Sequence, residues 1–247
     1  GVTEFLPISS SGHLVLSKSL LGFPSEGAFL EVALHGGTLV PILVFYRKRI
    51  ASLVCGLLAR DGESWRMAEM LAVATIPTGV AYLTVKDMLD RAYQSPVAAA
   101  SALCATGFLL ILPVGRRRPR QESMTPLNAL LIGIAQAFAL TPGISRSGST
   151  IIMARHRGVS AERAAEFSFL MAIPVLVAAV LLELPDIGGA ATESLSFGGL
   201  AVGMATAAIV GYVSLVFLIK MLAADRFWVF GVYCLVVGVV GLAATMG

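Results

Sequence analysis

Long apolar segments, separated by short polar stretches, are the feature that most constrains the fold of this chain. A helix needs about 20 mainly apolar residues to cross a bilayer. Six segments reach or approach that length: 28–46, 68–85, 96–114, 166–184, 197–222 and 228–246. Only 13% of the residues are charged, about half the fraction found in soluble domains. The sequence therefore predicts an all-α polytopic membrane protein and excludes a soluble globule.

Two further apolar stretches, residues 1–16 and 126–154, are each interrupted by a proline and a serine cluster. Pro7 lies before the first cluster, and residues 141–143 (Thr-Pro-Gly) lie before the second. Each arm is too short to cross a bilayer alone. Irregular backbone at membrane depth is tolerated only where protein or a wet cavity surrounds it. We therefore expect two re-entrant helical hairpins.

The distribution of lysine and arginine predicts the orientation, because cytoplasmic loops carry the excess of these residues. The cations gather in residues 47–66, 115–125, 155–165 and 220–227, whereas residues 185–196 contain none. With the four cation-rich regions in the cytoplasm, the first hairpin enters from outside and the second from inside. The net charge of +3 is too small a surplus to indicate nucleic acid as a partner.

The two serine clusters are related by an internal repeat. Residues 8–12 (Ile-Ser-Ser-Ser-Gly) recur as residues 144–148 (Ile-Ser-Arg-Ser-Gly), an offset of 136 positions. We expect one integral membrane domain over residues 1–247, with halves at about 1–115 and 126–247. Each half would hold one hairpin and three transmembrane helices. Because three spans are an odd number, the second half would enter the membrane from the opposite side and be inverted relative to the first. Inverted repeats of this kind bind their ligand where broken helices meet.

The serine clusters have the composition of a phosphate site. Serine caps helix N-termini, where free N–H groups and the positive end of the helix dipole attract anions. The candidate phosphate-binding residues are Ser9, Ser11, Gly12, Ser145, Ser147 and Gly148. Close helix packing by small residues is the alternative interpretation, but two related copies favour phosphate.

Three charged or titratable residues near the clusters are candidates for chemistry. Arg146 is costly at membrane depth and therefore a functional candidate, and its planar fork matches a phosphate. Its alternative role is an ion pair with Glu4 or Glu166. The Glu4 carboxylate could hold a divalent cation, Mg²⁺ or Ca²⁺, or lie at the membrane interface. His13 could serve as acid, base or nucleophile, or be structural.

Residues 4–13 (Glu-Phe-Leu-Pro-Ile-Ser-Ser-Ser-Gly-His) and 142–148 (Pro-Gly-Ile-Ser-Arg-Ser-Gly) closely resemble two signatures of the bacterial undecaprenyl-pyrophosphate phosphatase family, also known as the bacitracin-resistance family. The resemblance covers nearly the whole chain. It implies hydrolysis of the lipid carrier diphosphate to the monophosphate and inorganic phosphate, which recycles the carrier for peptidoglycan synthesis. It also implies a divalent cation, and an active site on the exterior side of the bacterial inner (plasma) membrane.

The resemblance also implies roles for individual residues. Glu4 matches the second acid of the family's acidic motif, Ser10 and His13 match its catalytic serine and histidine, and Ser145 and Arg146 match its phosphate-binding pair. The first acid would precede Gly1, so we expect native sequence before it. Ser10 is then the candidate nucleophile, and His13 would activate it or protonate the leaving group. Attack by His13 itself, or by water, stays open.

A function of a different class is also compatible with this sequence. Inverted repeats with broken helices are transporter architecture, so a secondary transporter or flippase of an anionic lipid is the alternative to the phosphatase. In either case the expected partners are a prenyl diphosphate lipid and the surrounding membrane lipids. A second copy of the chain is a further candidate partner.

Overall fold

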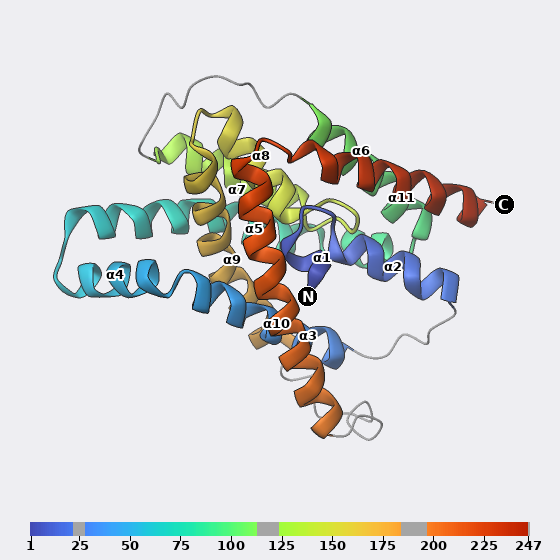
Figure 1. Cartoon of the computed structure of the whole chain (residues 1–247), viewed down its shortest axis with the longest axis horizontal. Helices are drawn as coiled ribbons and strands as arrows, with labels where there is room; N and C mark the ends of the chain where they lie inside the picture. The colour runs from blue at the N-terminus through green and yellow to red at the C-terminus, as the bar shows by residue number, and fades with distance from the viewer. Residues whose placement is uncertain (22–27, 113–123, 184–196, 247) are drawn as a thin grey trace.

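The computed structural model describes residues 1–21, 28–112, 124–183 and 197–246 (Figure 1). Within these ranges the chain is helical and contains no strand. The helices are α1 (Val2–Phe5), α2 (Ser10–Leu21), α3 (Ala28–Phe45), α4 (Arg47–Leu58), α5 (Gly62–Tyr93), α6 (Pro96–Ile111), α7 (Pro126–Phe138), α8 (Arg146–His156), α9 (Ala161–Glu183), α10 (Phe197–Ala223) and α11 (Trp228–Met246). The predicted all-α fold is confirmed.

Four helices in the described part of the chain are long and apolar enough to span a membrane. They are Gly62–Tyr93, Ala161–Leu181, Ala201–Ala223 and Trp228–Thr245. Each overlaps one of the predicted spans, so a multi-pass membrane protein is confirmed at this level. The predicted spans 28–46 and 96–114 are helical as α3 and α6, but α6 has only 16 residues, fewer than a bilayer requires.

Residues 47–58, which were predicted as part of a cytoplasmic loop, instead form helix α4 directly after Tyr46. Charge alone does not end a helix, because Arg, Lys, Ala and Leu all favour helical conformation. No residue of α4 is buried, and α4 projects from the body beside the first half of α5 (Figure 1).

Helix α5 begins at a side-chain cap. The carboxylate of Asp61 accepts hydrogen bonds from the Ser64 backbone amide at 2.9 Å and from the Ser64 hydroxyl at 2.8 Å. These bonds stabilise the ionised form and lower the pKa of Asp61 below its ordinary value. The helix then runs to Tyr93 with non-helical backbone angles at Val85, which is where the sequence predicted the span to end.

Both interrupted apolar stretches consist of two short helices, as predicted. Residues 6–9 separate α1 from α2, and residues 139–145 separate α7 from α8. Their insertion as re-entrant hairpins and the inverted relation of the halves stay predictions. The arginine-rich loop at 115–123 and the cation-free loop at 185–196, on which the predicted orientation partly rests, lie outside the described residues.

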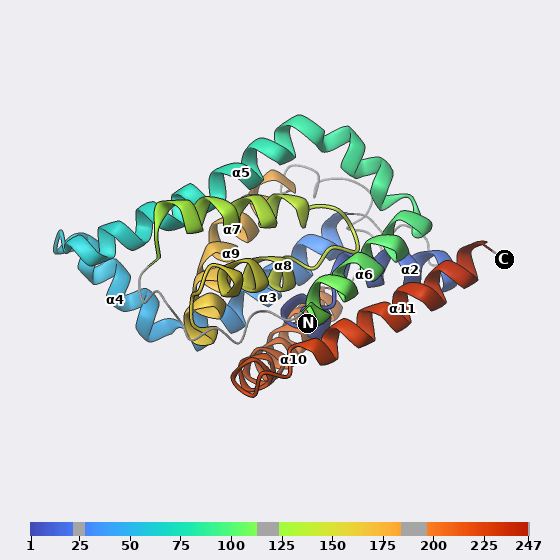
Figure 2. The ribbon, with the colours of Figure 1, turned by 90° about the horizontal axis from the view of Figure 1, so that it is seen from above.

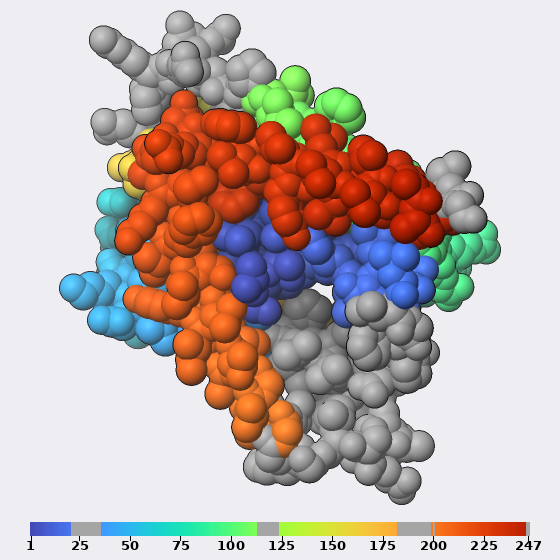
Figure 3. Space-filling model, turned by 45° about the vertical axis from the view of Figure 1, so that its right-hand side comes forward, coloured from blue at the N-terminus to red at the C-terminus, as the bar shows by residue number. Residues whose placement is uncertain are grey.

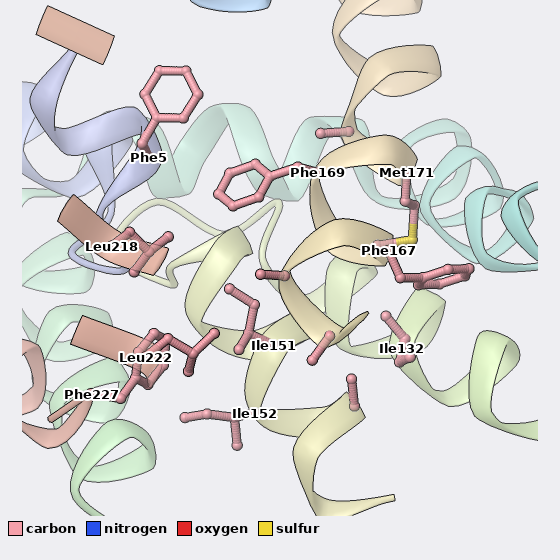
Figure 4. Close-up of a cluster of buried hydrophobic side chains, with 14 of the residues drawn as sticks. Phe5, Ile132, Ile151, Ile152, Phe167, Phe169, Met171, Leu218, Leu222 and Phe227 are labelled. Carbon is pink, nitrogen blue, oxygen red and sulfur yellow. The ribbon is translucent and has the colours of Figure 1, made fainter. Parts of the chain in front are cut away.

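Helix α8 lies within the hydrophobic core although it has only 11 residues. Its Ile151 and Ile152 are 0% and 2% exposed, and Figure 4 shows them among side chains from three other helices. These neighbours include Ile132 of α7, Phe167, Phe169 and Met171 of α9, and Leu218 and Leu222 of α10. This packing holds the start of α8, and therefore Arg146, inside the protein.

Helices α6 and α11 pack side by side at unusually close range (Figure 2). A Cβ atom on Gly107 would lie 2.8 Å from the Gly231 carbonyl oxygen, and one on Gly238 would lie 2.9 Å from the Ala100 carbonyl oxygen. Only glycine permits backbones to approach this closely. On the face shown in Figure 3, α1 and α2 lie between α10 and α11.

Candidate active site

The two serine clusters adopt the same local hydrogen-bonding pattern. We call residues 7–12 the first serine turn and residues 143–148 the second. Ser9 Oγ accepts a hydrogen bond from the Gly12 amide at 3.3 Å, and Ser145 Oγ accepts one from the Gly148 amide at 3.1 Å. Each serine thereby caps a helix N-terminus, the first at α2 and the second at α8, as the sequence predicted.

The two serine turns are in direct backbone contact. A Cβ atom on Gly12 would lie 2.7 Å from the Gly143 Cα atom, so this approach requires glycine at position 12. Gly143 itself has a φ of +97°, and Ser9 has a φ of +62°, which is uncommon for a residue with a side chain. The interrupted helices therefore meet at these turns, 136 positions apart in sequence.

A cavity of about 130 Å³ lies between the two turns. Seven predicted site residues line it: Glu4, Ser9, Ser10, Ser11, Ser145, Arg146 and Ser147. Gly12 and Gly148 contribute to the same turns as amide donors. The structure thus brings nine of the ten predicted residues together, from helices α1, α2 and α8 and the two loops that precede α2 and α8.

Arg146 carries the main electrostatic feature of the cavity. Its Nη1 atom is buried and has no hydrogen-bond partner in the structure, and its charge interacts with that of Glu4. A buried N–H group without a partner is costly, and a guanidinium in this state is suited to bind an anionic oxygen. The cavity can therefore accept an oxyanion such as phosphate.

The alternative pairing of Arg146 with Glu166 is wrong. Glu166 Oε1 instead accepts a hydrogen bond from Arg49 Nε at 2.7 Å, and both side chains are about a third exposed. This ion pair lines a separate cavity of about 450 Å³ beside α4, α5 and α9. That cavity is larger than the one between the serine turns but contains none of the predicted site residues.

His13 faces away from the cavity. Its Nδ1 lies 2.8 Å from the Ser9 carbonyl oxygen, which can only accept a hydrogen bond, so Nδ1 carries a proton. Its Nε2 lies 3.0 Å from the Tyr233 hydroxyl, and the two rings are stacked. Both ring nitrogens are engaged and neither contacts Ser10. Direct proton transfer between Ser10 and His13 would therefore require the imidazole to move.

Sequence reasoning missed Tyr93, Tyr233 and Thr3 as neighbours of the site. Tyr93 and Thr3 line the cavity, and Tyr233 holds His13 from α11. No local pattern distinguishes these residues. Only Thr3 is close in sequence to a predicted site residue, because it directly precedes Glu4.

The cavity offers oxygen ligands for a divalent cation. The described residues contain no group of three or more His, Cys, Asp and Glu side chains that could hold a metal. Glu4 supplies a carboxylate, and the neighbouring serines supply hydroxyl oxygens. This donor set fits a hard cation such as Mg²⁺, which is commonly bound by one or two carboxylates together with substrate phosphates.

Comparison with known proteins agrees with the two signatures. The family described as Bacitracin resistance protein BacA matches residues 1–240. The undecaprenyl-diphosphatase of Rhodopirellula baltica is 40% identical over 243 residues, covering 96% of this chain and 91% of that protein. The undecaprenyl-diphosphatase of Halothermothrix orenii is 36% identical over 241 residues (97% and 92%), and that of Pelotomaculum thermopropionicum is 38% identical over 252 residues (99% and 93%). Because the family match extends over nearly the whole chain, this protein belongs to the bacitracin resistance protein BacA family.

Proposed function

We propose that this chain hydrolyses undecaprenyl diphosphate to undecaprenyl monophosphate and inorganic phosphate, and so recycles the lipid carrier for cell-wall synthesis and supports bacitracin resistance. The names of the relatives support this activity. The observation that carries the proposal is a cavity lined by the two serine turns and by Arg146, whose buried Nη1 atom has no hydrogen-bond partner.

The size of the cavity favours a phosphate head over a lipid chain. Its 130 Å³ equals about four water molecules at roughly 30 Å³ each. A terminal phosphate fits this space and a prenyl chain does not. In this proposal the tail lies between helices and enters laterally from the bilayer, while only the diphosphate reaches Arg146.

The charge of the transferring phosphoryl group is stabilised from two directions. Arg146 donates from one side of the cavity, and helices α2 and α8 both begin at its wall, so the positive ends of their dipoles lie there. Preorganised donors of this kind lower the barrier because phosphoryl transfer depends mainly on positioning and electrostatic stabilisation. Among the serines of the cavity, we assign the anchoring roles to Ser9, Ser11, Ser145 and Ser147.

Ser10 is our candidate nucleophile. Its Oγ attacks the terminal phosphorus, the bond from this phosphorus to the bridging oxygen breaks, and the lipid monophosphate leaves. Water then hydrolyses the phosphoserine and releases inorganic phosphate. His13 accepts the Ser10 proton after its ring leaves Tyr233, and the departing oxygen takes it up. Water attack without a covalent intermediate is the competing route, and a phosphorylated Ser10 peptide in trapped enzyme would distinguish the two.

Glu4 is the proposed protein ligand of the divalent cation. A bound Mg²⁺ or Ca²⁺ would neutralise part of the diphosphate charge. The role of Glu4 is to fix the head of the substrate opposite Arg146. Glu4 and Arg146, whose charges attract each other in the structure, would then both interact with the bound diphosphate, Glu4 through the cation and Arg146 directly.

The finer architecture belongs to the same proposal. The identical capping bonds of the two serine turns support two repeat halves, each with one re-entrant hairpin. The charge distribution favours an inverted relation of these halves. In this arrangement the protein spans the bacterial inner membrane and the active site faces the exterior.

The activity is tested with protein purified in detergent and undecaprenyl diphosphate as substrate. We expect release of inorganic phosphate, loss of release in Arg146→Ala, and normal release in the control Arg66→Ala, which removes an exposed arginine near the start of α5 that does not line the cavity. A lipid transporter would release no phosphate under these conditions. Absence of release from the wild-type protein would overturn the proposed function and favour the transporter.

A further inference from the structure

The second serine turn is held by a side chain from a distant helix. Thr106 of α6 is 1% exposed. Its Oγ1 donates a hydrogen bond to the Gly143 carbonyl oxygen at 2.8 Å and accepts one from the Ser145 amide at 3.1 Å. The hydroxyl therefore bridges two backbone groups within the three residues that precede Arg146 at the start of α8.

The backbone at this point has little freedom to find another position. A Cβ atom on Gly143 would clash with the Ala99 carbonyl oxygen of α6, so the turn rests directly on that helix. The φ of +97° at Gly143 is one that residues with side chains rarely adopt. Because the helix surface and the Thr106 hydroxyl act together, the direction in which α8 begins depends on α6.

The first serine turn has a related but weaker support. Cys234 of α11 is fully buried, and its Sγ lies 3.7 Å from the Pro7 carbonyl oxygen. Pro7 corresponds to Gly143 by the offset of 136. The second turn is thus contacted from α6 and the first from α11, and these two helices pack against each other. The thiol of Cys234 is a weak hydrogen-bond donor. Thr106 is consequently the stronger of the two supports.

We infer that Thr106 is a positioning residue for phosphate hydrolysis, an inference that rests on the proposed function. Thr106 does not line the cavity and does not touch the substrate. It holds the Gly143 carbonyl and the Ser145 amide so that the α8 N-terminus and the Arg146 guanidinium point into the cavity. Loss of the bridge would misplace these groups without removing any of them.

The experiment compares three substitutions. Thr106→Val keeps the shape of the side chain but removes the hydroxyl, whereas Thr106→Ser keeps the hydroxyl. Thr78→Val is the matched control, because Thr78 is also a buried threonine whose hydroxyl accepts a hydrogen bond, from Gln136 Nε2 at 2.9 Å. Thr106→Val leaves the Ser145 amide and the Gly143 carbonyl without this partner, and Thr78→Val leaves the Gln136 amide group without its partner. Both valine variants should therefore lose thermal stability, Thr106→Val somewhat more.

We expect kcat for undecaprenyl diphosphate to fall roughly 10- to 100-fold in Thr106→Val, as for a catalytic group displaced by a fraction of an ångström to 1 Å. KM should change much less. Thr106→Ser should retain most of the activity, and Thr78→Val should retain normal kcat. Hydrogen–deuterium exchange at the Ser145 amide should accelerate in Thr106→Val and not in Thr78→Val.

Three results would overturn the inference. They are normal kcat in Thr106→Val, an equal loss of kcat in Thr78→Val, or failure of Thr106→Ser to restore activity in a folded protein. Hydrogen exchange in the second turn is read independently of activity. If the wild-type protein released no phosphate, the proposed function would fail, while the exchange data would still report whether Thr106 holds the turn.

Discussion

The contact between the two serine turns can be tested by adding one methyl group, in the variant Gly12→Ala. The new Cβ atom would stand 2.7 Å from the Gly143 Cα atom, so the turns must part by about 0.7 Å to reach ordinary contact at 3.4 Å. Overpacking of this kind costs about 1–3 kcal/mol, and the better helix propensity of alanine returns about 1 kcal/mol. The net loss of stability is therefore at most about 2 kcal/mol, and the protein should still fold.

The effect on activity should be much larger than the effect on stability. A catalytic group displaced by 1 Å can lose about 100-fold in rate, so a separation of about 0.7 Å should lower phosphate release roughly 10- to 100-fold. The assay measures kcat on undecaprenyl diphosphate and the thermal unfolding midpoint in the same detergent. Gly79→Ala is the matched control, because Gly79 lies in α5 and a Cβ there would meet nothing within 4 Å. Normal turnover in Gly12→Ala, with Gly79→Ala also normal, would refute the requirement for close contact.

Three further predictions concern the charge, the cation and the orientation of the site. Arg146→Lys keeps the positive charge but removes the planar fork, so turnover should fall by about 100-fold or more while the protein stays folded; near-normal hydrolysis would contradict a two-bond contact. EDTA should abolish hydrolysis, and Glu4→Gln should raise the Mg²⁺ concentration needed for half-maximal rate; an unchanged Mg²⁺ dependence would remove Glu4 from the cation site. In a background without the three native cysteines, an impermeant thiol reagent should label Gln94→Cys but not Glu162→Cys in intact cells, because the proposed orientation places the cation-rich region 155–165 in the cytoplasm; the opposite pattern would invert the topology.

The properties that sequence predicted well depend on contacts between near neighbours in the chain. Apolar segments of spanning length become helices because their backbone groups must pair within the segment. The caps at Ser9 and Ser145 join atoms three residues apart, so the motif alone specifies them. The repeat between residues 8–12 and 144–148 appears in the structure as the same local hydrogen bonds at both turns.

Where the prediction was wrong or incomplete, the deciding contact spans a long sequence separation. Glu166 pairs with Arg49, 117 positions away, whereas the sequence suggested it as a candidate ion-pair partner of Arg146. His13 bonds to Tyr233, 220 positions away, and this contact turns its ring from the cavity. Helix α4 was missed for a different reason, because its cations indicated a loop although their helix propensity is high.

By itself, the sequence determined that this chain is a helical membrane protein with two serine turns suited to an anion, because composition and spacing act over a few residues. Only the tertiary structure decided that Glu4, Ser10 and Arg146 share one cavity and that His13 does not line it. The close approach of α6 and α11 and the contact of Gly12 with Gly143 arise from packing among distant segments. Side-chain direction and burial follow from that packing, and no local pattern encodes them.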